Sequence, residues 1–495
     1  AIGTAAALQQ LVSGAHESAR GTAFENLTAA DSEGLHGYDD WLRAIAAAAA
    51  LGTGDRDGAR SQLQLLDAAG ARVRRGDRAI HHYLRGWLAA LDGDAAGACR
   101  DARTAVGLAV EVGMPWLECL ARIALAQLLA DADDRRGCET QLRSAEALAE
   151  RLASAPLRFW VQLAAAGAAL AMNDEAAALD PLKTAFALGR EHGFQHALWW
   201  RSREVADLCA LALRHRIEPE FARGLVRGRK LVPHVPPLRV RDWPWPFRIR
   251  TLGGLQLLQG AAAAEFSGKG PGRPLELLKV LVALGGENVR AEQLADALWP
   301  HVEADFAHKS FTATLHRLRR LFGDDDAVIL REARLGLNPA LVWVDTWALE
   351  HVLRELDDAL RLPNAQRVAP LLANLADEAL ALYRGPFLPD ESEQPGYIAC
   401  REQFRARLLR CLSRVARQRE EAEQAEAGAD LYLRLIEADD LFEAPYRYLM
   451  LSYQRSGDLG EGRATYERLR TVLSTKLKVM PSAETQAVYA SLGTP

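Results

Sequence analysis

The sequence repeats itself about every 40 residues over its N-terminal part. The markers of the repeat are four aspartates at the starts of Ala- or Cys-containing runs: Asp55, Asp94, Asp134 and Asp174. The intervals between them are 39, 40 and 40 residues, a fixed period typical of stacked helical hairpins. We expect each aspartate to lie in a turn and to cap the next helix. The small residues Ala59 and Ala98, which follow such turns, predict close helix packing.

This pattern resembles tetratricopeptide-like repeats, in the longer form found in the sensor arrays of large ATP-dependent bacterial activators of the maltose-activator type. The resemblance implies a helical sensor array over residues 1–230, with a concave face that binds a small-molecule or protein inducer. Tryptophans recur about once per repeat, at Trp41, Trp87, Trp116, Trp160 and Trp199. Two interpretations of them stay open: they line the binding face, or they pack between helices.

Composition sets the class of protein. The 495 residues predict about three domains, and 49% hydrophobic content with 25% charged residues is ordinary for a globular chain. No apolar run is long enough to span a membrane, so we expect no membrane partner. The six cysteines form no C-x-x-C pair, which favours a reduced, cytoplasmic protein. Because the chain begins with Ala1 and no signal peptide follows, we expect a fragment or a processed product.

A proline-rich segment follows the array. Residues 231–246 read LVPHVPPLRVRDWPWP, in which five prolines forbid a helix and favour an extended, semi-rigid linker. Basic residues lie just before this segment and within it. They are either solvated linker charge or an auxiliary phosphate contact.

One helix beyond the linker carries a polar face of unusual composition. Residues 305–322 read DFAHKSFTATLHRLRRLF, with Asp305 as the expected N-cap and Gly323 as the expected stop. The apolar residues share one stripe and should face a core: Phe311, Leu315, Leu318 and Phe322. The opposite face gathers cations, donors and a small residue without any acid. Such a face fits the DNA major groove, where Arg reads guanine and Lys or Arg neutralises phosphate; the alternative is a solvated basic face.

The sequence around this helix predicts a winged helix-turn-helix over residues 247–345. A strand hairpin at 247–258 breaks at Gly253-Gly254. A buried helix at 274–284 and a shorter helix at 290–299 precede the helix at 305–322, and a β-rich stretch at 327–345 follows. The order is β-hairpin, three helices, β-hairpin, with the third helix as the reader.

This segment resembles the DNA-binding domain of OmpR-type response regulators and, more closely, that of SARP-type activators. The resemblance rests on Leu252-Gly253, on Leu298-Trp299-Pro300 and on the run from Leu315 to Leu321. It implies that the third helix lies in the major groove. The residues then expected to face bases are Thr312, Ala313, His316 and Arg317. Those expected at the DNA backbone or the flanks are Lys309, Arg319 and Arg320, with Arg331 or Arg334 of the wing reaching the minor groove or a phosphate.

Local charge agrees with a nucleic-acid partner. Residues 225–322 hold 15 Lys and Arg against 8 Asp and Glu, a net of +7 within a chain of −5. A local cationic excess of this kind is what counterion release from DNA requires.

Residues 346–495 are again helical in pattern, with Thr346 as an expected cap and Ser482 at the start of the last helix. They resemble the bacterial transcriptional activator domain of SARP-type regulators, itself a tetratricopeptide-like bundle. That resemblance implies contact with RNA polymerase. Relatives with this domain order often carry an ATP-hydrolysing switch module before the repeats, and such a module would precede this chain.

Motifs for enzyme chemistry are missing. The sequence has no phosphate loop, since Gly268-Lys269-Gly270 has the wrong spacing, and no H-E-x-x-H, G-x-S-x-G or Cys/His metal spacing. We therefore expect no enzyme activity, no cofactor and no metal.

Together these features predict a mostly α-helical fold made of a helical repeat array, a winged helix-turn-helix with small β-hairpins and a second tetratricopeptide-like helical domain. The expected function is sequence-specific binding of double-stranded DNA by a signal-responsive activator, as a homodimer or a tandem pair. The alternative is a helical-repeat interaction scaffold whose winged helix docks protein.

Overall fold

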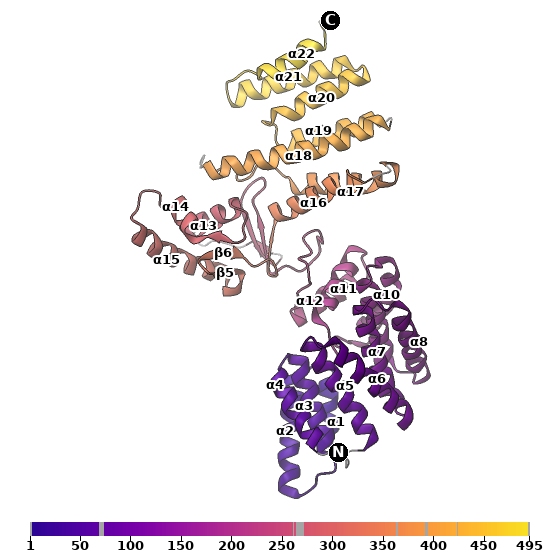
Figure 1. Cartoon of the computed structure of the whole chain (residues 1–495). Helices are drawn as coiled ribbons and strands as arrows, with labels where there is room; N and C mark the ends of the chain where they lie inside the picture. The colour runs from indigo at the N-terminus through magenta and orange to yellow at the C-terminus, as the bar shows by residue number, and fades with distance from the viewer. Residues whose placement is uncertain are drawn as a thin grey trace. The chain divides into compact units, whose positions relative to one another are not determined.

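The computed structural model describes residues 2–68, 74–260, 262–263, 272–362, 365–391, 395–422 and 424–493. The chain divides into two compact units, Ala1–Pro244 and Trp245–Pro495. Helices dominate both units, as predicted, and the strands are short (Figure 1). The Gly268-Lys269-Gly270 stretch lies outside the described residues.

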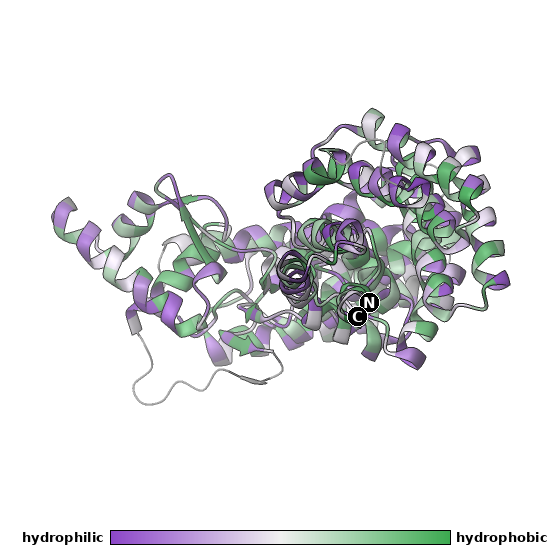
Figure 2. Cartoon of the chain, turned by 90° about the horizontal axis from the view of Figure 1, so that it is seen from below, coloured by the Kyte–Doolittle hydropathy of each residue, from purple (hydrophilic) through white to green (hydrophobic). Residues whose placement is uncertain are grey.

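The N-terminal unit is a series of helical hairpins. Within its described residues the helices are α1 (Ile2–Val12), α2 (His16–Glu33), α3 (Asp39–Thr53), α4 (Arg56–Ala68), α5 (Arg75–Leu91), α6 (Ala95–Val112), α7 (Pro115–Asp131), α8 (Arg135–Arg151), α9 (Ala155–Ala171), α10 (Glu175–His192), α11 (Ser202–Arg214) and α12 (Pro219–Arg229). Hydrophobic and hydrophilic residues alternate around individual helices, as expected of amphipathic helices (Figure 2). Among the described residues, no helix combines the length and apolar character needed to cross a bilayer.

The repeat aspartates cap helices as predicted. Side-chain oxygens of Asp94 and Asp134 accept hydrogen bonds from backbone N–H groups three residues on, at 2.8 and 2.9 Å. Asp55 and Asp174 make the same bond at 2.8 and 3.1 Å. Each bond satisfies one donor that the first helical turn leaves unpaired. The period of about 40 residues is therefore the period of the capped turn.

The tryptophans mainly pack between helices. Trp87 is buried and stacks on Trp199, with ring centroids 5.9 Å apart and planes 12° apart. Trp160 is also buried, and its Nε1–H donates to the carbonyl oxygen of His196 at 3.0 Å. Trp41 and Trp116 lie 6.2 Å apart between their centroids. Packing is thus the main role, although Trp87 and Trp199 also line a cavity described below.

The proline-rich segment and the last helix of the array are held by hydrogen bonds within the unit. The backbone N–H of His234 donates to Asp207 of α11 at 3.1 Å. The Arg229 guanidinium of α12 donates to the carbonyl oxygens of Gly14 and Ser13, at 3.1 and 2.9 Å. The end of the array therefore contacts its beginning.

The C-terminal unit begins with the elements predicted for a winged helix. In chain order these are β1 (Phe247–Arg250), β2 (Gln256–Gln259), β3 (Ala262–Ala263), α13 (Gly272–Ala283), β4 (Val289–Arg290), α14 (Ala291–Leu298), α15 (Ala304–Phe322), the 3-10 turn η2 (Asp325–Ala327), β5 (Val328–Arg331), β6 (Arg334–Leu337) and β7 (Val342–Val344). β1 and β2 pair antiparallel, and Gly253 and Gly254 adopt positive φ at the predicted break. The sequence did not predict β4, which pairs with β6, or the parallel pairing of β7 with β1.

The remaining helices continue the same unit. They are α16 (Asp345–Ala359), α17 (Ala365–Leu382), α18 (Pro395–Glu421), α19 (Ala425–Ala438), α20 (Glu443–Ser456), α21 (Leu459–Lys476) and α22 (Ala483–Ser491). Ser482 caps α22 by accepting from the N–H of Thr485, as predicted. The prediction for Thr346 was wrong: it lies inside α16, whose N-cap is Val344 and has no side-chain cap. The side chain of Asp345 instead accepts hydrogen bonds from the backbone N–H groups of Thr251 and Leu252, which follow β1.

The winged-helix elements and the helices after them share one hydrophobic core, which runs from Phe247 to Leu473. The turn after β1 meets the segment between α17 and α18. Gly253 N–H donates to the carbonyl oxygen of Pro386 at 3.0 Å, and Leu388 N–H donates to that of Thr251 at 2.9 Å. The indole of Trp347 donates to the carbonyl oxygen of Gly285 at 2.7 Å. The first and second halves of this unit are therefore packed together.

We expect Gly253→Ala to destabilise this junction by about 1–3 kcal/mol. The φ of Gly253 is +87°, and an added Cβ would lie 3.0 Å from the carbonyl oxygen of Arg384. Thermal unfolding measures the effect. Gly396→Ala is the matched control, because a Cβ there meets nothing within 4 Å; equal melting temperatures for the two variants would contradict the expectation.

Candidate nucleic-acid interface

α15 begins and ends close to the predicted positions. Gly323 adopts the left-handed conformation at its C-terminus with φ of 70°, as predicted. The predicted N-cap was wrong: the helix starts at Ala304 after Glu303, which makes no side-chain cap bond, and Asp305 lies in the first turn. An acid in the first turn still interacts favourably with the helix dipole.

The apolar stripe of α15 is buried as predicted. Phe311, Leu315, Leu318 and Phe322 are each at most 4% exposed. Phe322 meets Phe247 of β1 edge-on, with ring centroids 5.0 Å apart. This packing fixes which side of α15 is left to solvent.

The solvent side holds most of the predicted contact residues. All six of the following are exposed on α15: Lys309, Thr312, Ala313, His316, Arg317 and Arg320. Among the described residues, the four charged or imidazole side chains of this set form no ion pair and no side-chain hydrogen bond. Thr312 Oγ1 donates to the carbonyl oxygen of His308 at 3.0 Å, as an exposed helical threonine often does. The face therefore offers donors and positive charge that have no partner within the described parts of the chain.

Two of the predicted DNA contacts, Arg319 and Arg334, also make hydrogen bonds within the fold. Arg319 is half-buried, and its Nε donates to the carbonyl oxygen of Val328 at 3.1 Å. Arg334 donates through Nη1 to the carbonyl oxygen of Asn288 at 3.1 Å. A guanidinium has five N–H donors, so each arginine retains others. The Arg319 bond joins α15 to β5, and the Arg334 bond joins β6 to the residue before β4.

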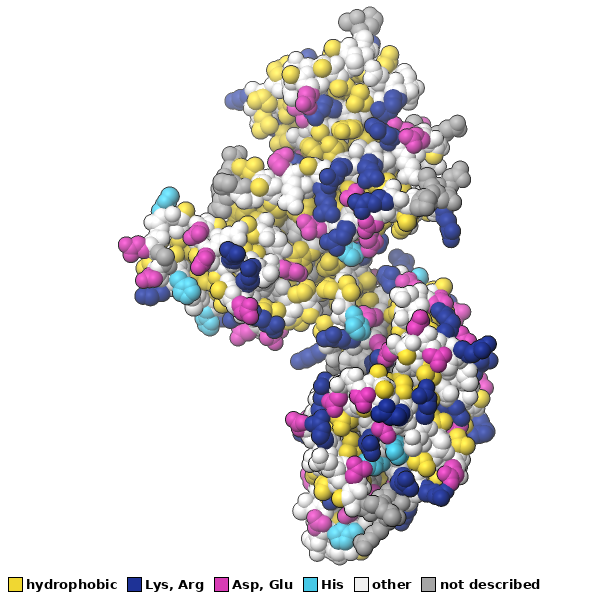
Figure 3. All heavy atoms as spheres, in the orientation of Figure 1, with side chains coloured by type: hydrophobic (Ala, Val, Ile, Leu, Met, Phe, Trp, Pro, Cys, Tyr) yellow, Lys and Arg dark blue, Asp and Glu magenta, His cyan; other side chains and the backbone are white. Residues whose placement is uncertain are grey.

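The wing itself carries mixed charge. Arg331 is exposed and lies opposite Arg334 in the β5–β6 register. Glu332 and Ala333 form the turn with φ of 48° and 58°. An exposed acid at the tip opposes entry into the minor groove, which is negative. Acidic, cationic and histidine side chains also lie side by side on the face of the α13–α15 region that Figure 3 shows.

The sequence-based prediction of this face did not include the exposed apolar residue Phe306. Phe306 is 64% exposed in the first turn of α15. Its spacing from Ala313 and Arg317 puts it on the same face, which was the available sequence signal. Aromatic and methyl-bearing side chains contact the thymine methyl in the major groove, so Phe306 belongs to the candidate interface.

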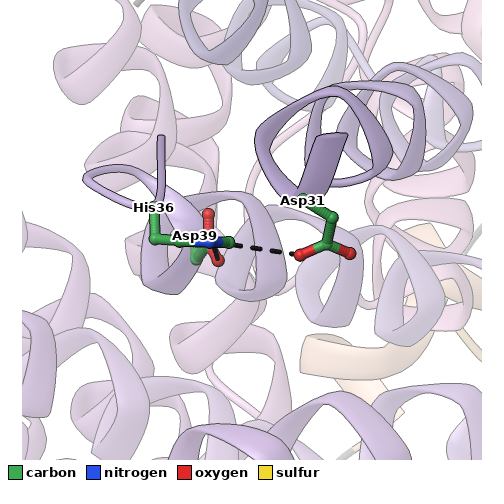
Figure 4. Close-up of side chains that lie close together, drawn as sticks. All are labelled: Asp31, His36 and Asp39. Atoms are coloured by element: carbon green, nitrogen blue, oxygen red, sulfur yellow. Dashed lines mark hydrogen bonds and ion pairs between the residues drawn. The ribbon is translucent and has the colours of Figure 1, made fainter. Parts of the chain in front are cut away.

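A separate cluster lies at the connection between α2 and α3. His36 Nδ1 is 3.0 Å from Asp39 Oδ2 and 3.9 Å from Asp31 Oδ1 (Figure 4). Their ligand atoms lie within 4.8 Å of one another, close enough to hold a cation. The cluster is largely exposed, and an ordinary surface ion pair accounts for its geometry.

Comparison with known proteins concerns the C-terminal unit first. Residues 344–492 match the family model described as "Bacterial transcriptional activator domain". This segment is therefore similar to the activator domains of bacterial transcription regulators, and it begins at the last residue of β7. No curated protein matches the chain.

Two solved structures that resemble the chain do so weakly. One is Mycobacterium tuberculosis EmbR in complex with a low-affinity phosphopeptide, at 18% identity and a TM-score of 0.36, covering 50% of this chain and 65% of that one. The chain thus spans less than two thirds of that protein. Another is the P58(IPK) TPR domain, at 11% identity and a TM-score of 0.18, covering 92% of this chain and 97% of that one. These TM-scores are too low to establish a shared fold.

Proposed function

We propose that the chain is a sequence-specific DNA-binding transcription activator of the SARP type. In this proposal α15 reads the major groove, and the helices after the wing contact RNA polymerase. The protein works in the cytoplasm as a homodimer or tandem pair and needs no cofactor in this chain. The match of residues 344–492 to an activator domain supports the regulatory role.

One observation carries the DNA-binding proposal. The cationic face of α15 is exposed and has no partners among the described residues, while its apolar stripe is anchored in the core. A helix held in this way can enter the major groove without rearranging the fold. Base contacts from this face supply specificity, and its lysine and arginines supply the salt-sensitive attraction to phosphate.

Salt dependence tests the proposal against the interaction-scaffold alternative. Affinity of the full chain for duplexes selected from a random pool is measured by fluorescence anisotropy from about 50 to about 200 mM salt. A steep, linear fall of log affinity with log salt supports DNA binding. Absence of duplex binding even at low salt would overturn the proposal and favour a protein-docking role.

Arg317→Ala is expected to weaken binding to a selected duplex by about 1–3 kcal/mol and to relax sequence choice. Its side chain is exposed on α15 and has no ion pair or hydrogen bond among the described residues, so its guanidinium is available to bind guanine bidentately. Lys309→Ala should weaken selected and random duplexes alike, because a phosphate contact carries no sequence information. Arg410→Ala, an exposed arginine of α18, is the matched control. Equal losses on both kinds of duplex for Arg317→Ala would defeat the assignment.

A further inference from the structure

A cavity of about 520 Å³ lies within the N-terminal unit, where α3, α5, α7 and α11 meet. Its volume falls in the range of small-molecule sites. Three indoles wall it: Trp87, Trp199 and Trp200. Small residues of α5 and of the turn after it, Ala90 and Gly93, also line the cavity, and a Cβ added at Gly93 would meet nothing within 4 Å. The indoles therefore favour a flat aromatic ring against them.

The indole wall is held in place at a conformational cost. Trp199 has a φ of 60°, a region that bulky L-residues rarely adopt. Stacking on Trp87 and an edge contact with Tyr83 at 5.4 Å hold it there. Strain of this kind is often found at ligand clamps. A small adjoining chamber shares Trp199 and includes Gln127, whose Oε1 is buried without a hydrogen-bond partner among the described residues.

The polar end of the cavity is the N-terminus of α11. Arg201 is the N-cap and makes no side-chain cap bond, so the first N–H groups lack the acceptor that a cap provides. The Arg201 guanidinium is instead paired with Asp131 at 2.8 Å and with Glu204 at 2.6 Å. Arg203 lines the same cavity, is exposed, and has no ion pair among the described residues. A helix N-terminus beside an unpaired arginine favours an anion.

We propose that this cavity binds a small planar organic anion, with its ring against the indoles and its acidic group at the α11 N-terminus and Arg203. This site would supply the signal input of the proposed regulator. Ligand binding itself is independent of the DNA-binding proposal, because every residue that forms the site belongs to the N-terminal unit.

Two fluorescent probes test the chemistry with the full chain. Anilinonaphthalenesulfonate is an aromatic anion with a flat naphthalene ring, and N-phenylnaphthylamine is its neutral counterpart without the sulfonate. We expect saturable binding of one anionic probe per chain. Arg203→Gln should weaken the anionic probe about tenfold and leave the neutral probe unchanged, because only the charged contact is removed. Trp200→Ala should weaken both probes.

Controls separate the site from general stickiness. Arg151→Gln, an exposed arginine in the last turn of α8, is the matched control and should change neither affinity. Circular dichroism melts confirm that each variant folds, and Arg203→Gln is at an exposed position where folding should persist. Equal anionic-probe affinity for Arg203→Gln and Arg151→Gln would overturn the proposal. DNA affinity of Arg203→Gln is measured in parallel, so loss of either function is seen separately.

A pH series gives a second readout. Burial is the main reason that the pKa of Glu204 is raised to about 7. The nearby carboxylates of Asp131 and Asp207 also raise this pKa, whereas Arg201 and His234 lower it. The protonated carboxyl does not repel an anion, so affinity for the anionic probe should fall about tenfold from about pH 6 to about pH 8. Glu204→Gln should flatten this fall. A pH profile unchanged by Glu204→Gln would contradict the placement of the anion beside this carboxyl.

Discussion

Asp439→Ala is expected to lower the stability of the C-terminal unit by about 3–5 kcal/mol. Asp439 is buried at the end of α19 and binds Arg405 of α18 through both oxygens, at 2.7 and 3.0 Å. The hydroxyl of Tyr383 donates to it at 2.9 Å. Burial alone would lower the pKa of Arg405, but the hydrogen bonds and charge of Asp439 outweigh burial and raise it. Alanine therefore removes the buried counter-charge of a half-buried guanidinium and leaves it only the largely exposed carboxylate of Glu402, 2.9 Å from its Nη1.

The measurement is chemical unfolding, together with hydrogen exchange of peptides from α18 and α19. Asp430→Ala is the matched control, because that carboxylate is 57% exposed and only 3.7 Å from Arg434. It should cost less than about 1 kcal/mol. Asp439→Asn should fall between the two, since the amide oxygen still accepts one hydrogen bond but carries no charge. Indistinguishable unfolding of Asp439→Ala and Asp430→Ala would show that this cluster does not stabilise the unit.

Features that depend on residues close together in the sequence were predicted correctly. The capping bonds of Asp94 and Asp134 depend only on residues three positions away, so the repeat spacing revealed them. The buried stripe of α15 follows from helical periodicity, and Gly323 follows from the left-handed stop. The same logic set the exposed side of α15, including Lys309 and Arg317.

Contacts between distant residues were not predictable from one sequence. Arg319 and Arg334 looked like free cations, and only the fold brings the carbonyls of Val328 and Asn288 to them. The start of α15 was misplaced because Glu303 and Asp305 are both acceptable near a helix N-terminus. The segment that carries Trp199 has no periodicity at all. Its packing on α5, more than 100 residues earlier, follows from the tertiary structure.

Asp345 is the clearest case of a residue whose importance only the fold reveals. It is 2% exposed and accepts hydrogen bonds from Thr251 N at 2.7 Å, Thr251 Oγ1 at 2.9 Å and Leu252 N at 2.8 Å. These donors lie 94 and 93 residues away in sequence. The pKa of its carboxyl is raised, because the effect of burial exceeds the opposing effect of these hydrogen bonds. Asp345 thereby joins the end of β1 to the start of α16.

Asp345→Ala should therefore destabilise the C-terminal unit by about 3–5 kcal/mol, because it leaves two backbone N–H groups in the core without an acceptor. Thr251→Val, which removes only the hydroxyl, should cost about 1 kcal/mol. Hydrogen exchange of peptides covering β1 and β7 measures where protection is lost, and thermal unfolding measures how much. Asp325→Ala, at an exposed position of η2, is the control. If Asp345→Ala unfolds like Asp325→Ala, the junction between β1 and α16 rests on apolar packing alone. In the expected case the Asp345 carboxylate joins α16 to the end of β1, and β1 in turn packs against α15 through Phe247 and Phe322.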